Sequence, residues 1–137
     1  MRFAASPVAL MVPFVLVMMG CGDDPPTTPT TPTTPTVTET FTGTLNINGA
    51  ITHNFVAGTF GTVTSTLTVV TPDTTVIGMA LGTWNGITCQ IVLAADKAAI
   101  NTTVTGSVST VGNLCVRLYD VGNITEPTSY EVQVVHP

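Results

Sequence analysis

The sequence predicts an all-β domain in residues 37–137, a β-sandwich or jelly roll of about eight antiparallel strands. Three observations lead to this prediction. Threonine and valine, whose branched side chains fit a pleated sheet, are abundant. Apolar and polar residues alternate over short segments, which are separated by glycine, asparagine or proline. Few leucine, glutamate, lysine or arginine residues are present to favour a long helix.

Each expected strand is a short alternating or apolar segment that ends at a turn signal. The first carries Phe41, Leu45 and Ile47 on one face and ends at Asn48–Gly49, which favours a tight turn. Asn85–Gly86 predicts a hairpin turn after the fourth strand. The expected strands are 41–47, 51–55, 62–69, 76–84, 87–94, 101–108, 113–120 and 129–136.

The third strand has the clearest alternation. We expect Val63, Leu67 and Val69 to face the core and the threonines between them to face outward. Thr71-Pro72-Asp73 then predicts a turn. The alanine-rich segment 94–99 is expected to be a loop between strands rather than a helical turn.

The low charge of the chain limits its partners. Charged residues make up 8% of the sequence, against roughly 25% in ordinary soluble domains. Without a leader that contains Arg2, the basic residues Lys97 and Arg117 remain against eight acidic ones, a net charge of −6. Binding to a phosphate backbone needs several lysine or arginine contacts. The composition therefore excludes nucleic acid as a partner.

The N-terminus has the layout of a secretory signal peptide, which we assign to residues 1–20. Arg2 supplies a positive charge, and an apolar run follows from Val8 to Met19. The alternative is a permanent transmembrane helix. A spanning helix needs about 20 apolar residues, however, and Pro7 and Pro13 interrupt a segment that is already short.

Met18-Met19-Gly20-Cys21 resembles the lipobox of bacterial lipoproteins, in which a small residue precedes an obligatory cysteine. Met18 stands where leucine is usual. The resemblance implies cleavage after Gly20, transfer of diacylglycerol to the Cys21 thiol and acylation of the new N-terminus. Several acyl chains anchor a protein stably in a membrane. The alternative is an ordinary signal peptide with Cys21 beside the cleavage site by chance.

In lipoproteins of bacteria with two membranes, an aspartate directly after the cysteine favours retention at the inner membrane. This chain has Gly22 there, so the resemblance implies a cell-envelope lipoprotein of the outer membrane, on its periplasmic or surface face. Residues 21–36 form a Pro/Thr-rich linker with too few apolar side chains to build a core. Its prolines favour polyproline II, in which residues 23–36 extend over about 40 Å.

Two segments near the C-terminus, 112–120 and 129–134, read Gly-Asn-Leu-Cys-Val-Arg-Leu-Tyr-Asp and Ser-Tyr-Glu-Val-Gln-Val. They resemble the closing strands of the bacterial pre-peptidase C-terminal (PPC) domain. Phe55 and Gly61-Thr62-Val63 fit that family as well, whereas Leu114 stands where an aromatic residue is usual. The resemblance implies a non-enzymatic β-sandwich with accessory, binding or maturation roles, of the kind found at the ends of secreted hydrolases.

Cys89 and Cys115 fall in two expected strands of an exported domain. Export to an oxidising compartment favours a disulfide between them. Closing a loop of about 25 residues would stabilise the fold by about 3 kcal/mol. The alternatives are two buried free thiols and a metal pair, although neither cysteine has a second ligand at zinc spacing nearby.

His53 and His136 are the only histidines, and a Ser-His-Asp triad would need one of them as its base. No Gly-x-Ser-x-Gly elbow is present. We therefore expect no enzyme, with His53 at a strand end and His136 at the exposed tip of the last strand. Trp84, half-exposed before a hairpin, is a candidate to stack on a sugar or contact a protein; the alternative is that it covers the edge of the core.

Asp73, Asp96, Asp120 and Glu126 are expected in loops between strands. Several could meet at one end of the sandwich and bind a structural Ca²⁺. Some PPC domains bind calcium, but the carboxylates of that role have no clear match here. Because the spacing also fits no known calcium loop, solvated turn residues are the simpler interpretation, and no cofactor is expected.

Together these features predict a non-catalytic, lipid-anchored module of the cell envelope that binds or assists other envelope or secreted components. The expected partners are the membrane, through lipid on Cys21, and a protein or glycan ligand. The alternatives are a structural or stress-related envelope lipoprotein, a calcium- or carbohydrate-binding module, and a small hydrolase that uses His53.

Overall fold

The computed structural model describes residue 31 and residues 33–137, and residues 33–137 belong to a compact unit that spans Pro32–Pro137. All regular secondary structure in the described residues is β-strand, which confirms the predicted all-β class. No helix among these residues is long and apolar enough to span a membrane. The strands are β1 (Val37–Leu45), β2 (Ala50–Ala57), β3 (Gly61–Thr71), β4 (Ile77–Trp84), β5 (Cys89–Ala98), β6 (Thr103–Val108), β7 (Gly112–Tyr119) and β8 (Thr128–His136).

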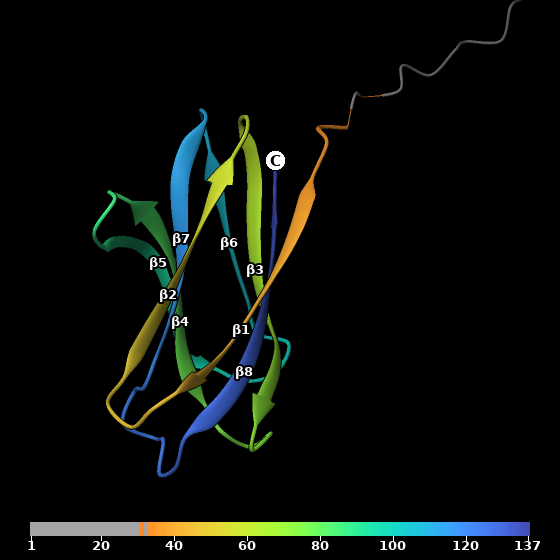
Figure 1. The fold of residues 1–137 in the computed structure, drawn as a ribbon. Coiled ribbons are helices and arrows are strands. Elements are labelled where there is room, and N and C mark those ends of the chain that lie inside the picture. Colours follow the sequence, from red (N-terminus) through yellow and green to blue (C-terminus); the bar gives the residue numbers. More distant parts are fainter. Residues whose placement is uncertain (1–30, 32) are drawn as a thin grey trace, which may run out of the picture. The chain divides into compact units, whose positions relative to one another are not determined.

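The strands form two four-stranded antiparallel sheets (Figure 1). One sheet has the order β1-β8-β3-β6 and the other the order β2-β7-β4-β5. The pairs β1–β8, β2–β7, β3–β6 and β4–β5 nest within one another, as if one long hairpin with its turn between β4 and β5 were folded over itself. Two sheets connected in this way form a jelly roll.

Alternation along the strands supplies the core between the sheets. In β8, for example, Tyr130, Val132 and Val134 face inward and are buried. On the outer face of the same sheet, threonine side chains of β3 and β6 hydrogen-bond across the strands. The core comprises Leu45, Phe55, Ala57, Val63, Leu67, Val70, Ile77, Met79, Leu81, Ala98, Val104, Leu114, Val116, Leu118, Ile124, Tyr130, Val132 and Val134.

Two expectations about inward-facing residues are wrong. A β-bulge between Leu67 and Val69 reverses the alternation of β3. Val69 is therefore exposed, and Val70 takes the buried position. Ile47, expected to share the face of Leu45, lies in the turn after β1 and is also exposed.

The prediction of a loop at 94–99 is wrong as well, because most of this segment belongs to β5. Ala95 pairs with Met79 of β4 and packs against the core, and Ala98 pairs with Ile77 and is fully buried. A second irregularity between Ile77 and Met79 interrupts the two-residue period here. The segment therefore has no alternation that could be recognised in the sequence.

Both predicted Asn-Gly turns form, but one connects the two sheets and the other connects neighbouring strands of one sheet. The turn at Asn48–Gly49 closes through a 2.8 Å hydrogen bond from Gly49 N to Asn46 O, but it connects strands of opposite sheets. The turn at residues 85–88 connects β4 to β5 as a true hairpin, in which Trp84 pairs with Cys89.

Because all neighbouring strands are antiparallel, their connections gather at two ends of the domain (Figure 1). We call the end at which the chain enters β1 the proximal end. It holds loops 58–60, 85–88 and 109–111 and the C-terminal Pro137. The distal end holds loops 46–49, 72–76, 99–102 and 120–127.

Candidate functional site

The two histidines belong to a row of aromatic rings along the side of the sandwich where β1 faces β2. Phe41 stacks on His53 with 4.9 Å between ring centroids, and His53 meets Tyr130 edge-on at 6.0 Å. In the other direction Phe41 contacts Phe55 at 6.5 Å, and Phe55 contacts His136 at 5.1 Å. These five residues, which we call the ring ladder, join both sheets along this side.

The polar atoms of these histidines also join strands. His53 Nε2 and the Tyr130 hydroxyl share a 2.8 Å hydrogen bond between β2 and β8. His136 Nε2 lies 3.0 Å from Glu39 Oε1 on β1. Burial lowers the pKa of His53 from its ordinary value of 6.5 and raises the pKa of Tyr130 to about 12. In the described residues, neither histidine hydrogen-bonds to a serine or threonine hydroxyl.

The expected positions of both histidines are wrong. His53 lies in the middle of β2 rather than at a strand end. His136 is 3% exposed rather than at an open tip. The physical reason is the stacking partner that each ring finds: Phe41 covers His53, and Phe55 covers His136.

The Asp120 carboxylate accepts hydrogen bonds from the backbone of its own loop. Its Oδ1 accepts hydrogen bonds from the backbone N–H groups of Gly122, Asn123 and Ile124, and its Oδ2 accepts one from Asn48. The bond from Asn48, followed by those within the loop, lowers the pKa of Asp120. This carboxylate organises the distal end, where it connects loops 46–49 and 120–127.

The other three acids are in separate places. Asp73 and Glu126 are exposed in two distal loops. Asp96 was expected in a loop but lies in β5, where it accepts a short hydrogen bond from the Tyr119 hydroxyl. Burial, as the larger cause, and this hydrogen bond, as the second, raise the pKa of Tyr119 to about 12. Among the described residues, no three His, Cys, Asp or Glu side chains gather as a metal-binding group.

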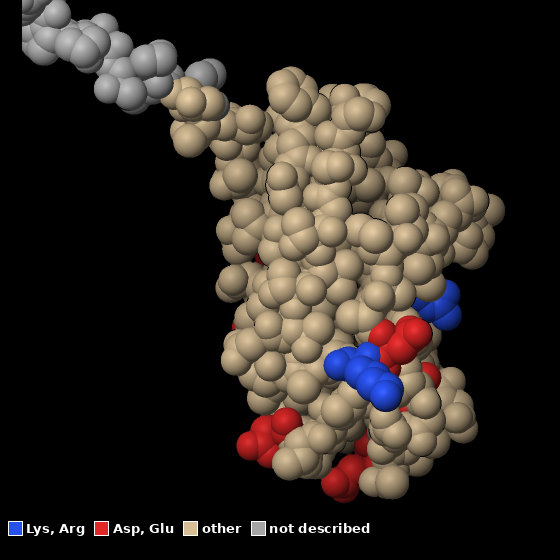
Figure 2. All heavy atoms as spheres, turned by 180° about the vertical axis from the view of Figure 1, so that it is seen from behind, with Lys and Arg blue, Asp and Glu red and all other residues tan. Residues whose placement is uncertain are grey.

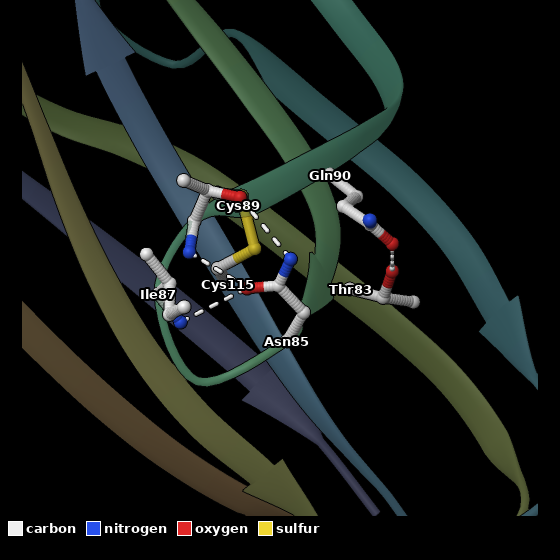
Figure 3. The surroundings of a disulfide bond; sticks show 7 residues. Thr83, Asn85, Ile87, Cys89, Gln90 and Cys115 are labelled. Atoms are coloured by element: carbon white, nitrogen blue, oxygen red, sulfur yellow. Dashed lines mark hydrogen bonds between the residues drawn. A yellow bond between two sulfur atoms is a disulfide. The ribbon is translucent and has the colours of Figure 1, made fainter.

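The predicted disulfide between Cys89 and Cys115 is present, with 5.8 Å between the Cα atoms. It connects β5 to β7, although β4 lies between these strands in the sheet (Figure 3). Gly82 of β4 pairs with Cys115 on one side, and a Cβ atom there would collide with the Gln90 carbonyl on the other. The missing side chain allows β5 to approach closely enough for the disulfide to form.

Trp84 lies at the proximal end of β4 and is half-buried. Asp96 and Asp120 lie toward the distal end, close to Tyr119, which pairs with Gly78 at the start of β4. The structure therefore does not bring Trp84 and the candidate acids into one site.

The sequence predicted a strand at 87–94 but not its position at the edge of a sheet, where it forms β5. Among the strands that the structure describes, it is the last of its sheet and pairs only with β4. Residues 91–94, Ile-Val-Leu-Ala, are all exposed, and Val92 is 69% exposed. Val92 is the extra residue of a β-bulge, because Leu81 pairs with Leu93 and Gly82 with Ile91. We call residues 91–94 the β5 edge.

An apolar pocket of about 110 Å³ adjoins the β5 edge. It opens between β5 and β6, the end strands of the two sheets, on the side opposite the ring ladder. Leu93 reaches across this side and contacts Gly106 of β6. The pocket is lined mainly by Val63, Leu81, Val92, Leu93, Val108 and Leu114.

This combination is unusual for an edge strand. Exposed edges are normally protected by charged residues or proline, since their unpaired N–H and C=O groups can pair with another chain. Residues 85–95 contain no charge and no proline; the charges of β5, Asp96 and Lys97, lie at its distal end, and the β-bulge at Val92 is the protective feature within this range. The β5 edge therefore offers main-chain hydrogen bonds beside an apolar pocket, which is the arrangement that binds an added strand. In the sequence the same run is equally typical of a buried strand, so only the topology reveals it.

Cys21, the predicted site of lipid attachment, lies outside the described residues. No protein-family model and no curated protein matches this chain significantly.

Proposed function

We propose that this chain is a lipid-anchored, non-catalytic binding module of the bacterial cell envelope, exported to the outer membrane and held there by acyl groups on Cys21. Its jelly roll binds an extended polypeptide segment of another envelope or secreted component. An accessory role of this kind is also what the resemblance to the PPC domain implies.

The observation that carries the proposal is the uncharged, exposed β5 edge next to the apolar pocket. An added strand would pair with the free backbone groups of residues 91–94, and one of its side chains would enter the pocket. Backbone pairing supplies affinity in this mode of recognition, and the pocket supplies specificity. The ligand segment is therefore expected to be extended, with an apolar side chain at the position facing the pocket.

The use of the histidines supports a function without catalysis. A general base must reach the proton that it removes. Here both rings pack against phenylalanine rings in the ring ladder, and their nitrogen atoms contact Tyr130 and Glu39. His53 thereby connects the two sheets, and His136 connects β8 to β1 within one sheet.

Selection of peptides by the lipidated chain in nanodiscs tests the proposal. We expect linear peptides displayed on phage to be enriched for extended sequences with alternating apolar residues. A lysine in place of Val92 places a charge on the edge, so Val92→Lys is expected to abolish the enrichment. Bound peptide should also slow the hydrogen exchange of the β5 amides.

Val69→Lys is the matched control, because Val69 is another exposed valine in a strand, on the opposite sheet. It should select the same peptides as the unaltered chain. The proposal is wrong if no peptide is enriched, or if Val92→Lys selects the same set.

A further inference from the structure

Each of the three loops at the proximal end carries one exposed, large apolar side chain. Phe60 is 65% exposed in loop 58–60, Ile87 is 82% exposed in loop 85–88, and Val111 is 62% exposed in loop 109–111. We call these residues the apolar tips. Exposed apolar groups that lie close together on a soluble domain mark a contact with a protein or a membrane.

Strand pairing brings the apolar tips to the same region. Ala57 pairs with Gly112, so the loop that follows β2 and the loop that precedes β7 are neighbours. This places Phe60 beside Val111. Thr83 pairs with Leu114, and the disulfide holds Cys89 against Cys115, so loop 85–88 is fixed near the start of β7 as well (Figure 3).

The tips are held in ordered loops. Asn85 Oδ1 accepts hydrogen bonds from the backbone N–H groups of Ile87, at 2.9 Å, and Thr88, at 2.8 Å. At the next loop, Gly58 N donates to the carbonyl of the C-terminal Pro137 at 2.8 Å. Ile87 is therefore exposed on a turn that is closed by two hydrogen bonds to the Asn85 side chain.

The loops at this end of the domain differ in charge from the distal loops, two of which contain acidic residues. None of the three proximal loops contains a charged residue. On the face shown in Figure 2, the Lys, Arg, Asp and Glu side chains lie mainly toward the distal half. A contact made here therefore relies on burial of apolar groups rather than on attraction between charges.

The direction of the chain indicates what the tips meet. The linker that leads from Cys21 enters the domain at this same end, at Val37. The lipid anchor keeps the apolar tips at a high effective concentration near the membrane, so a weak affinity of the domain for the bilayer is sufficient. Side chains that protrude from separate loops also suit a fluid lipid surface, which closes around each of them, better than they suit a preformed protein pocket.

We propose that Phe60, Ile87 and Val111 insert into the surface of the bilayer that holds Cys21, so that the jelly roll rests with its proximal end on the membrane. This inference depends on the proposed lipid anchor. In this position the β5 edge stands beside the membrane, open to a partner from the side.

The only tryptophan, Trp84, ends β4 next to loop 85–88 and serves as an internal probe. The experiment uses the full lipidated chain in phosphatidylcholine vesicles whose acyl chains carry bromine, a contact quencher of tryptophan fluorescence. We expect strong quenching of Trp84. Because no basic residue takes part, the quenching should be the same at low and high salt.

Ile87→Asp and Phe60→Asp are each expected to lower the ratio of docked to free domain about tenfold or more, since a carboxylate is poorly accepted by lipid. Ile47→Asp is the matched control, because Ile47 is an exposed isoleucine in a distal loop; it should leave the quenching unchanged. Near-ultraviolet circular dichroism checks that each variant is folded, and Ile87→Ser offers a milder substitution at the same position.

Flotation of the vesicles separates this inference from the lipid anchor. A chain that does not float refutes the anchor. A chain that floats but shows no quenching, or quenching that Ile87→Asp leaves intact, overturns the docking of the domain. A third outcome is an absence of quenching together with a dimer that Phe60→Asp dissociates. This result would identify a second copy of the chain as the partner of the apolar tips, and it would also overturn the docking on the membrane.

Discussion

At the scale of single residues, glycines opposite tyrosines determine how two strand pairs pack. Gly43 pairs with Tyr130, and a Cβ atom on Gly43 would lie 2.5 Å from the Tyr130 hydroxyl oxygen. Gly78 pairs with Tyr119 in the same way and is covered by its ring. Tyr130 is buried and bonded to His53, so its ring has little freedom to move aside.

Gly43→Ala is therefore expected to lower the free energy of unfolding by about 1–3 kcal/mol, the usual cost of overpacking. Denaturant unfolding measures the change. Gly58→Ala is the control: its nearest foreign atom is 3.8 Å from the added Cβ, so we expect a change within about 0.5 kcal/mol. Equal effects of the two substitutions would contradict the packing described here.

His53 should make stability depend on pH. Burial lowers the pKa of the folded-state imidazole below 6.5, so the unfolded chain takes up the proton first as pH falls. The contribution of His53 to the free energy of unfolding is complete above pH 6.5. It is lost as the pH falls from there through the pKa of the folded state. Asp120, whose pKa is lowered from 3.8, acts in a separate, more acidic range.

As the pH is lowered from about 7 to about 5, we expect the midpoint concentration of denaturant to decrease. His53→Gln is expected to make the midpoint less dependent on pH over this range. An NMR titration reads the pKa of His53 directly. A value above 6.5, or an unchanged profile in the variant, would show that the ring is not buried as described.

Residue types alone could not have located the ring ladder. Ile51, His53 and Phe55 alternate in the sequence, so an inward His53 agrees with the period of a strand. The partners of the histidines are distant in sequence, however: Tyr130 is 77 residues from His53, and Glu39 is 97 residues from His136. Such contacts depend on which strands become neighbours.

At the scale of elements, the disulfide holds the β4–β5 hairpin against β7. The two cysteines are separated by 26 residues, and a crosslink over such a loop contributes about 3 kcal/mol. We expect the double variant Cys89→Ala/Cys115→Ala to lose about this much stability in guanidinium unfolding. Reduction of the unaltered chain should have a similar effect, and Cys21→Ala should have none. A double variant as stable as the parent would mean that the hairpin is held by other contacts.

The limits of prediction at this scale lie in the β-bulges. All eight strands were located, because alternation and turn residues are local properties of the sequence. The facing of Val69, the extension of β5 over 94–98 and the exposure of Val92 were not predicted. Each lies at a point where one strand has an extra residue relative to its partner, which a single strand's sequence does not reveal.

At the scale of the whole molecule, the jelly-roll order explains why the two sides of the sandwich differ. On one side β1 faces β2, and the ring ladder closes the gap between the sheets. On the other side β5 faces β6, and an apolar pocket opens beside the contact of Leu93 with Gly106. The same order brings the start of β1 and the apolar tips to one end. The proposed membrane contact and the proposed ligand binding thereby use different surfaces of one small domain.

The claim on which the whole account depends is that Cys21 carries the chain to a membrane. Mass spectrometry of the N-terminal peptide, from protein isolated out of the membrane fraction, tests it most directly. We predict a chain that begins at Cys21, with diacylglycerol on the sulfur and an acyl group on the amino nitrogen. An unmodified N-terminus at Cys21, or a chain that keeps residues 1–20, would contradict the account.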